Sequence, residues 1–322
     1  MATFKYYNFQ VLPLDGQDEN LIGKGGYKSI FEKYALSVNN AMRQRKLLKI
    51  SHDLKTGMHI SFKKIDIKDG FAQGKLIKFD HVDSLVEVYT DQELYKNSDK
   101  MSIASSLRIE FDFVFDFDKH IIAIEAKAGI PSYKVLIEAL TSLLSQTTTE
   151  LYSEHYIKLI ELTDAASLEE ILDNAEGFRK VSVEITFSNS DKFETQLASL
   201  IDEDSRKNSI HSIKAEQRPE QGRNSKSLSI VMLPLVLLST KLGNSNITYM
   251  QNGKENTYHM RDYPVKMRVT KDGKMTDDDY YSQIMTSIIN ADFKAKVAHK
   301  TNEKLFASDY KLTGNETEHN EN

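Results

Sequence analysis

The sequence predicts an α+β protein of two domains, and three observations support this fold class. Strand-like alternation dominates the first 127 residues, which also hold one long helical segment. Strand and helix patterns then alternate over residues 105–204. A polar stretch rich in helix and strand breakers, residues 205–227, separates an acidic N-terminal half from a basic C-terminal half.

These observations set the predicted domain limits. Residues 1–204 should form an N-terminal domain with a mixed or antiparallel sheet and helices on one face. Residues 205–227 should be a polar linker, and residues 228–312 a smaller, basic, β-rich domain with a final helix. Residues 313–322 contain few apolar side chains and should be a disordered tail.

The central element of the N-terminal domain is a predicted hairpin at residues 106–127, SLRIEFDFVFDFDKHIIAIEAK. Its apolar positions recur with period 2, which places one set of side chains on a single face of each strand. A two-residue turn at Asp118 and Lys119 would pair Phe117 with His120 and Phe115 with Ile122. The apolar face of this hairpin carries Phe111, Phe113, Phe115, Phe117, Ile122, Ile124 and Ala126. We expect it to form the centre of the core, because buried Phe side chains contribute about 2–3 kcal/mol each.

The remaining elements follow from periodicity, turn signals and capping residues. An apolar stripe predicts a helix at residues 27–48, and Ser167 with Glu170 forms a capping box for a short helix at residues 168–174. Asn252-Gly253 predicts a hairpin turn, and Thr276 should cap the final helix, residues 277–300. Further helices are expected at residues 133–151 and 191–201, while residues 228–240 fit either a strand or a helix. Further strands are expected at residues 5–14, 59–67, 74–79, 85–89, 156–162, 178–187, 209–215, 246–250, 257–260 and 265–270.

The second face of the predicted hairpin is charged. The same register places Asp112 opposite Glu125 and Glu110 opposite Lys127. Two carboxylates directly opposite each other destabilise a strand pair, so water, neighbouring cations or a metal ion must compensate. One interpretation is a solvent-exposed face with ordinary surface ion pairs, which is common on antiparallel strands.

The other interpretation is catalytic. An Asp that faces Glu-x-Lys on the next strand resembles the core of PD-(D/E)xK nucleases. This resemblance implies a divalent metal ion such as Mg²⁺ held by Asp112 and Glu125, with Lys127 positioning the attacking water. The Pro that often precedes the Asp in that family is absent here. No nucleophile elbow, Cys nucleophile or closely spaced pair of His residues indicates another reaction.

The charge distribution indicates a polyanionic partner for the C-terminal half. Residues 205–312 carry 18 Lys and Arg against 11 Asp and Glu, whereas residues 1–204 carry 24 against 33. Contacts from Lys and Arg to phosphates bind nucleic acid without regard to sequence, and no motif for reading bases is present. The candidate phosphate contacts are Arg206, Lys207, Arg218, Arg223, Lys226, Lys254, Arg261, Lys266 and Arg268. The acidic half has one basic patch, Arg43, Arg45, Lys46 and Lys49, at the end of its first helix, where cations also suit the helix dipole.

Composition narrows the class of protein further. The chain of 322 residues has no Cys, which excludes disulfides and thiolate metal sites and fits a reducing cytoplasm. Its start, MATFKYYNFQ, lacks the apolar core of a signal peptide, and the longest apolar run, residues 228–238, is too short to cross a bilayer. We therefore expect a cytoplasmic protein.

The layout of elements resembles that of RexA-type phage-exclusion proteins and related antiphage-defence components. The closest local likeness is HIIAIEAK, residues 120–127, followed by a break and a helix, together with NITYMQNGKENTYHMRDYPVKM, residues 246–267, also followed by a helix. The resemblance implies a homodimer that binds double-stranded DNA with little sequence preference and signals to a membrane or effector protein. It implies neither an enzyme, nor a cofactor or metal, nor a small-molecule substrate.

Overall fold

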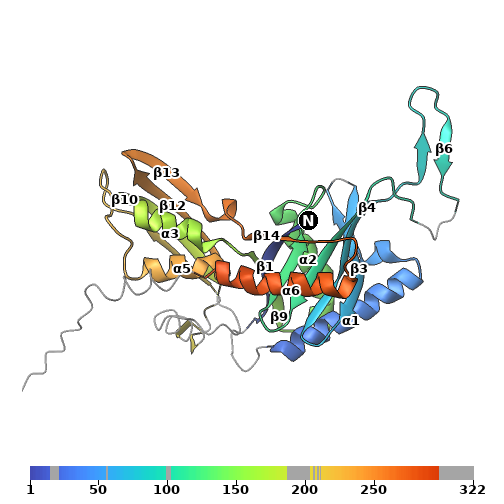
Figure 1. The fold of residues 1–322 in the computed structure, drawn as a ribbon, viewed down its shortest axis with the longest axis horizontal. Coiled ribbons are helices and arrows are strands. Elements are labelled where there is room, and N and C mark those ends of the chain that lie inside the picture. The colour runs from blue at the N-terminus through green and yellow to red at the C-terminus, as the bar shows by residue number, and fades with distance from the viewer. Residues whose placement is uncertain are drawn as a thin grey trace, which may run out of the picture.

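The computed structural model describes residues 1–14, 22–55, 57–98, 103–186, 204, 205, 207, 208, 210 and 212–296. It confirms the α+β class: an antiparallel sheet with helices forms one lobe, and a smaller sheet with its own helices forms a second lobe (Figure 1). Within the described residues, no helix is both long enough and apolar enough to cross a membrane.

The first lobe is built on an eight-stranded sheet in the order β14-β1-β8-β7-β4-β3-β2, with β9 also paired to β1. The strand β1, predicted at residues 5–14, lies inside the sheet, because β8 pairs with one side of it and β14 and β9 pair with the other. The strands of this sheet are β1 (Ala2–Pro13), β2 (His52–Leu54), β3 (Met58–Ile67), β4 (Phe71–Asp80), β7 (Arg108–Asp116), β8 (Ile121–Glu125), β9 (His155–Glu161) and β14 (Lys266–Val269).

The hairpin of β7 and β8 has the predicted register, with Phe113 opposite Ile124 and Phe115 opposite Ile122. The turn, however, spans the four residues 117–120, so Phe117 and His120 are not a ladder pair. The reason lies in local hydrogen bonds. The Asp116 carboxylate accepts from the backbone N–H groups of residues 118 and 119, and His120 adopts a left-handed conformation with φ 55°.

Helices cover both faces of this sheet. The helices α1 (Lys24–Arg43) and α2 (Tyr133–Leu151) pack on the face that carries the four Phe side chains of the hairpin, all of them fully buried. The other face is covered by α6 (Asp277–Lys294), whose Tyr280, Ile284 and Ile288 pack against β1, β7 and β8. The hairpin face predicted to be exposed or catalytic therefore lies against α6, the last helix within the described residues.

The second lobe is a four-stranded sheet in the order β11-β10-β12-β13. Its strands are β10 (Gly177–Thr186), β11 (Ser212–Gln217), β12 (Gly243–Gln251) and β13 (Lys254–His259). The helices α3 (Ala165–Asn174) and α5 (Met232–Leu242) pack on one face. Residues 228–240, whose pattern fits either a strand or a helix, are therefore mostly helical, because α5 begins at Met232. Asp164, not Ser167, caps α3, since its side chain accepts from the Ala166 N–H.

The two sheets do not follow the predicted domain limits. The predicted linker supplies β11, which pairs with β10 from the predicted N-terminal domain. The strand β14 and the helix α6, both predicted in the C-terminal domain, belong to the first lobe. The predicted linker at 205–227 therefore does not coincide with a division between sheets, because strand pairing over long sequence separations joins its two sides. The helix expected at 191–201 and the tail at 313–322 lie outside the described residues.

A third, two-stranded sheet stands apart from both lobes. The strands β5 (Ser84–Val86) and β6 (Glu93–Lys96) pair only with each other among the described strands. The strand β5 overlaps the strand expected at residues 85–89, whereas β6 has no counterpart among the expected strands. In Figure 1 this hairpin, which we call the β5–β6 arm (residues 83–97), projects away from the first lobe.

Candidate functional site: a buried carboxylate cluster and a basic strand edge

Two carboxylates of the β7–β8 hairpin lie buried on the face that α6 covers. Asp112 is 4% exposed and Glu125 is 9% exposed. They are adjacent across the hairpin, since the backbone N–H of Asp112 donates to Glu125 Oε2 at 3.2 Å. The expectation of an ordinary solvent-exposed face is therefore wrong at these two positions.

Two lysines from distant parts of the chain contact Asp112. Lys75 Nζ lies 2.8 Å from Asp112 Oδ1, and Lys271 Nζ lies 3.2 Å from Asp112 Oδ2. Burial raises the pKa of the Asp112 carboxyl, but the hydrogen bond from Lys75 and the charges of both lysines outweigh burial, so the pKa lies below its ordinary value. The carboxylate is therefore ionised at neutral pH.

A tyrosine of α6 completes the surroundings of Asp112. The Tyr281 hydroxyl lies 3.3 Å from Asp112 Oδ1 and 3.2 Å from the Gly74 carbonyl oxygen. Burial and the Asp112 charge both raise the Tyr281 pKa well above its usual range, so this group remains a neutral donor. Gly74 itself lies where β3 bulges, and a Cβ there would stand 2.0 Å from the Lys64 carbonyl oxygen, which only a glycine avoids.

Lys127 contacts the second carboxylate. Its Nζ lies 2.8 Å from Glu125 Oε2 and 5.6 Å from the centre of the Phe111 ring. The predicted opposition of Glu110 and Lys127 is not an ion pair, because Glu110 contacts Lys63 and Arg108 instead. The structure thus brings together Asp112, Glu125 and Lys127, the three residues of the nuclease interpretation. We call these three residues with Lys75, Lys271 and Tyr281 the carboxylate cluster. Sequence reasoning missed the last three, because each depends on pairing or packing across 37 residues or more.

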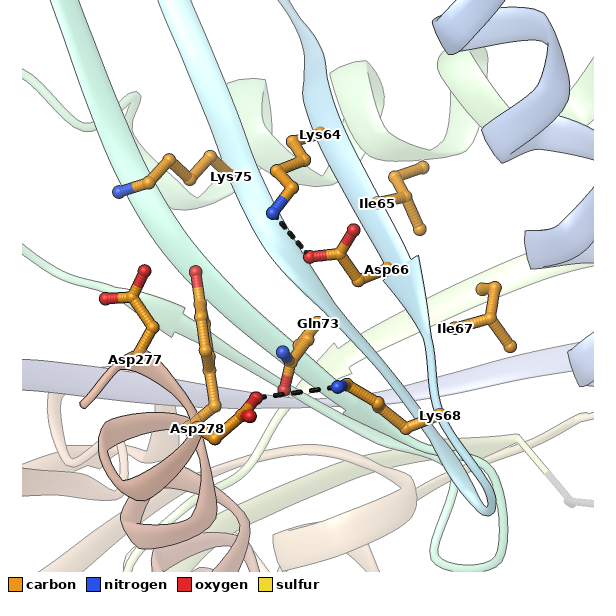
Figure 2. Close-up of a pocket in the computed structure, with 10 residues that line it drawn as sticks. Lys64, Ile65, Asp66, Ile67, Lys68, Gln73, Lys75, Asp277 and Asp278 are labelled. Carbon is orange, nitrogen blue, oxygen red and sulfur yellow. Dashed lines mark hydrogen bonds and ion pairs between the residues drawn. The ribbon is translucent and has the colours of Figure 1, made fainter.

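A cavity of about 570 Å³ opens beside the carboxylate cluster (Figure 2). Lys75 and Tyr281 form part of its wall, so the cavity gives access to the two residues that contact Asp112 Oδ1. Charges of both signs line the cavity, with Lys64 paired to Asp66 at 2.7 Å. Its lining is Lys64, Ile65, Asp66, Ile67, Lys68, Gln73, Lys75, Asp277, Asp278 and Tyr281. Among the described residues, no group of three or more His, Asp or Glu side chains is arranged to hold a metal ion.

A second charged feature lies at the edge strand β14, on the other face of the sheet. Lys266 stands directly opposite Lys5 of β1, and Arg268 stands opposite Thr3. Lys5 contacts the buried Glu161 at 2.9 Å, and Tyr133, at the start of α2, interacts with both Glu161 and Arg261. Arg261 lies over the Tyr133 ring at 5.6 Å.

We call Lys5, Arg261, Lys266 and Arg268 the β14 basic edge. Of these four cations, Lys5 contacts the buried carboxylate of Glu161. Lys266, Arg268 and Arg261 are exposed, whereas Glu161 is only 8% exposed. Glu161 compensates the charge of Lys5, whereas no ion pair among the described residues involves Lys266 or Arg268. These two exposed cations are therefore the ones that an added anion would contact. The arrangement is suited to binding phosphate groups of a polyanion.

The other predicted phosphate contacts are not gathered at this edge. Arg218 pairs with Glu216 and Arg223 pairs with Glu220 at 3.2 Å, both beside the second sheet. Lys254 begins β13, and Lys226 and Lys207 are exposed in other segments. Arg206 lies outside the described residues. The structure therefore brings together three of the predicted contacts, Arg261, Lys266 and Arg268, and adds Lys5 from the acidic half.

The fold and these two features define a mixed α+β protein whose largest sheet carries a charged cluster on one face and a basic edge on the other. A family described as a domain of unknown function, DUF4747, matches residues 5–290. The chain therefore belongs to the DUF4747 family. No curated protein matches the chain.

Proposed function

We propose that this protein binds the phosphate backbone of double-stranded DNA, without sequence preference, at the β14 basic edge. The observation that carries the proposal is the pair of exposed cations on β14, Lys266 and Arg268, on the same face of the sheet as Lys5. The counter-ion of Lys5 is the buried Glu161. A phosphate that binds between neighbouring cations offsets their mutual repulsion, so its binding is favourable.

The resemblance to RexA-type proteins supports duplex DNA as the polyanion and supports a role in antiphage defence or phage exclusion. In this role, the protein would sense DNA in the cytoplasm and act through a partner effector. Non-specific binding fits such a sensor because phosphate contacts carry no sequence information.

Replacement of two cations of the β14 basic edge tests the proposal. We expect Lys266→Ala/Arg268→Ala to weaken binding of a fluorescent duplex about tenfold or more, measured by anisotropy at a fixed low salt concentration. The slope of log K against log salt should decrease by about 2, because each lost phosphate contact contributes about 0.9.

The matched control is Arg218→Ala/Arg223→Ala, which removes the same charge from residues that are paired with Glu216 and Glu220. This control should bind DNA with nearly the wild-type affinity and slope. Equal losses in both double variants would show that total charge, not the β14 basic edge, governs binding. A wild-type protein that does not bind duplex DNA at low salt would reject the proposal outright.

A metal-dependent nuclease is the second candidate, and the specific observation that favours it is the meeting of Asp112, Glu125 and Lys127 in the carboxylate cluster. Mg²⁺ commonly takes one or two protein carboxylates together with substrate phosphate and water. Asp112 and Glu125 would hold the ion, and Lys127 would orient the attacking water. Lys75 and Lys271 contact the two oxygens of Asp112, so at least one of these lysines would have to move before a metal ion could bind there. Lys127 contacts Glu125 Oε2.

A cleavage assay decides between binding alone and catalysis. If the nuclease candidate is correct, plasmid DNA should be cut in the presence of Mg²⁺ or Mn²⁺ but not with a chelator. Asp112→Asn should then reduce the rate about a hundredfold or more, because it removes one of two metal-binding carboxylates. Asp278→Asn, an exposed carboxylate on the rim of the same cavity, is the control and should cut normally. DNA that remains intact with every metal, or full activity in a folded Asp112→Asn variant, rules out this candidate.

A further inference from the structure

The β5–β6 arm exposes a concentration of large apolar side chains. Tyr89 is 92% exposed and Val88 is 85% exposed, at the tip between the two strands. An isolated two-stranded hairpin is marginally stable in water, so an arm of this kind gains stability when its side chains are covered. The exposed apolar residues of the arm are Leu85, Val86, Val88, Tyr89, Leu94 and Tyr95.

The arm is also acidic. Residues 84–96 contain three carboxylates, Glu87, Asp91 and Glu93, and one cation, Lys96, which pairs with Glu93. A protein surface that binds this arm should therefore combine apolar side chains with positive charge.

One cavity of the first lobe has this combination. A cavity of about 330 Å³ lies at the end of α1, with six apolar residues in its lining: Ala41, Met42, Leu47, Ile77, Phe79 and Ile103. Its other lining residues are Arg45, Lys63, Ser105 and Arg108, three of which are cations. Lys63 and Arg108 share a single carboxylate, Glu110. Arg45, one residue of the basic patch at the end of α1, thus lines this apolar cavity.

The arm and this cavity are neighbours in the fold. The arm leaves the sheet just after Phe79 and returns just before Ile103 and Ser105, and all three residues line the cavity. The arm itself projects outward (Figure 1), so its tip is directed away from the cavity at its own base. In a twofold-symmetric pair, each arm would start beside one cavity and reach the other, which makes two identical contacts at once.

We propose that the β5–β6 arm of one copy docks in the basic, apolar cavity at the end of α1 in a second copy, so that the chain forms an arm-exchanged homodimer. Apolar arm residues fill the cavity, and Glu87, Asp91 and Glu93 face its cations. The resemblance to RexA-type proteins implies a homodimer but does not indicate a surface. The surface follows from the arm, the cavity and their opposite charges.

The first test is the oligomeric state of the full chain by sedimentation velocity over a range of concentrations. Wild-type protein should dimerise, and Tyr89→Ser/Leu94→Ser should weaken dimerisation about tenfold or more, because both residues are exposed apolar anchors. Ile230→Ser/Phe293→Ser removes two exposed apolar residues elsewhere and should leave the dimer intact. A wild-type monomer at all concentrations, or a dimer insensitive to the arm substitutions, would overturn the proposal.

Charge exchange tests which surface receives the arm. Arg45→Glu should weaken the dimer, and Glu93→Lys in the same chain should restore part of the lost affinity if the two side chains meet across the interface. If neither Glu93→Lys nor Asp91→Lys restores any affinity to the Arg45→Glu chain, the cavity is excluded as the surface that binds the arm.

Cross-linking gives an independent measurement, because the chain has no native Cys. A copy with Val88→Cys and a differently tagged copy with Met42→Cys should form a mixed cross-linked dimer with a short bismaleimide. A chain that carries both substitutions and cross-links only within itself would show that the arm covers its own cavity and would overturn the exchange. An arm that cross-links to neither cavity would likewise reject the arm-exchanged homodimer.

Discussion

Phe115→Ala is expected to lower the free energy of unfolding by about 3–5 kcal/mol, which is the usual cost of removing a buried aromatic ring. The Phe115 side chain is fully buried in the first lobe. Its ring centre lies 4.8 Å from that of Phe31 in α1 and 5.1 Å from that of Phe9 in β1. Substitution would therefore leave a cavity at the junction of the sheet with α1. Urea denaturation followed by circular dichroism measures the loss.

The control for this prediction is Phe293→Ala, at a Phe that is 78% exposed on α6. It should change the unfolding free energy by no more than about 0.5 kcal/mol, because exposed positions without special contacts tolerate substitution. A loss of less than about 1 kcal/mol for Phe115→Ala would contradict the packing of α1 against the hairpin face.

Sequence reasoning succeeds where the controlling interactions are local. The alternation of Phe111 to Phe117 fixes which face of the hairpin is buried, and its register follows from the short connection. Asn252 and Gly253 have positive φ values of 52° and 68°, as the predicted hairpin turn requires. In each case, the residues that determine the structure are close together in the chain.

The carboxylate cluster shows why the rest could not be predicted. Asp112 and Glu125 face each other within one hairpin, and this much follows from the sequence. Lys75 reaches Asp112 through the pairing of β4 with β7, and Lys271 reaches it only because β14 pairs with the start of β1. Periodicity within a segment carries no information about such long-range pairing.

The net charge of residues 205–312 also does not predict which of their cations are available to bind a ligand. A sum of charges along residues 205–312 treats every cation alike, but Arg218 and Arg223 are paired with neighbouring carboxylates. Lys5 comes from the acidic half and still stands opposite Lys266. The position of a charge in the sheet therefore decides its role more than the net charge of its segment.

Asp292→Ala is expected to cost about 3 kcal/mol of stability, because removing one partner of a buried ion pair leaves the other charges uncompensated. Asp292 of α6 is 6% exposed and contacts three lysines. Lys241 lies 3.0 Å away at the end of α5 in the second lobe, and Lys119 lies 3.4 Å away in the hairpin turn of the first lobe. Lys296 is the third, at 3.7 Å. We place the cost at the lower end of the usual range, because Lys119 and Lys296 are partly solvated.

Because Asp292 contacts both lobes, the substitution should also increase protease cleavage near the junction under native conditions. Asp278→Ala is the matched control: it lies on the same helix, its side chain is 79% exposed, and it contacts one lysine at 3.5 Å. Exposed pairs of this kind contribute little, so its stability should be close to that of wild type. Equal losses for the two variants would contradict the role of Asp292 as a link between lobes.

The pH dependence of this effect has a definite sign. Burial raises the Asp292 pKa, but the charges of Lys241, Lys296 and Lys119 outweigh burial and hold it below its ordinary value of 3.8. A carboxyl with a lower pKa in the folded state contributes stability above its unfolded pKa and loses it as pH falls through the folded value. The stability difference between wild type and Asp292→Asn should therefore be constant near neutral pH and shrink below about pH 4. A difference that stays constant or grows in acid would show that the Asp292 charge does not join the two lobes.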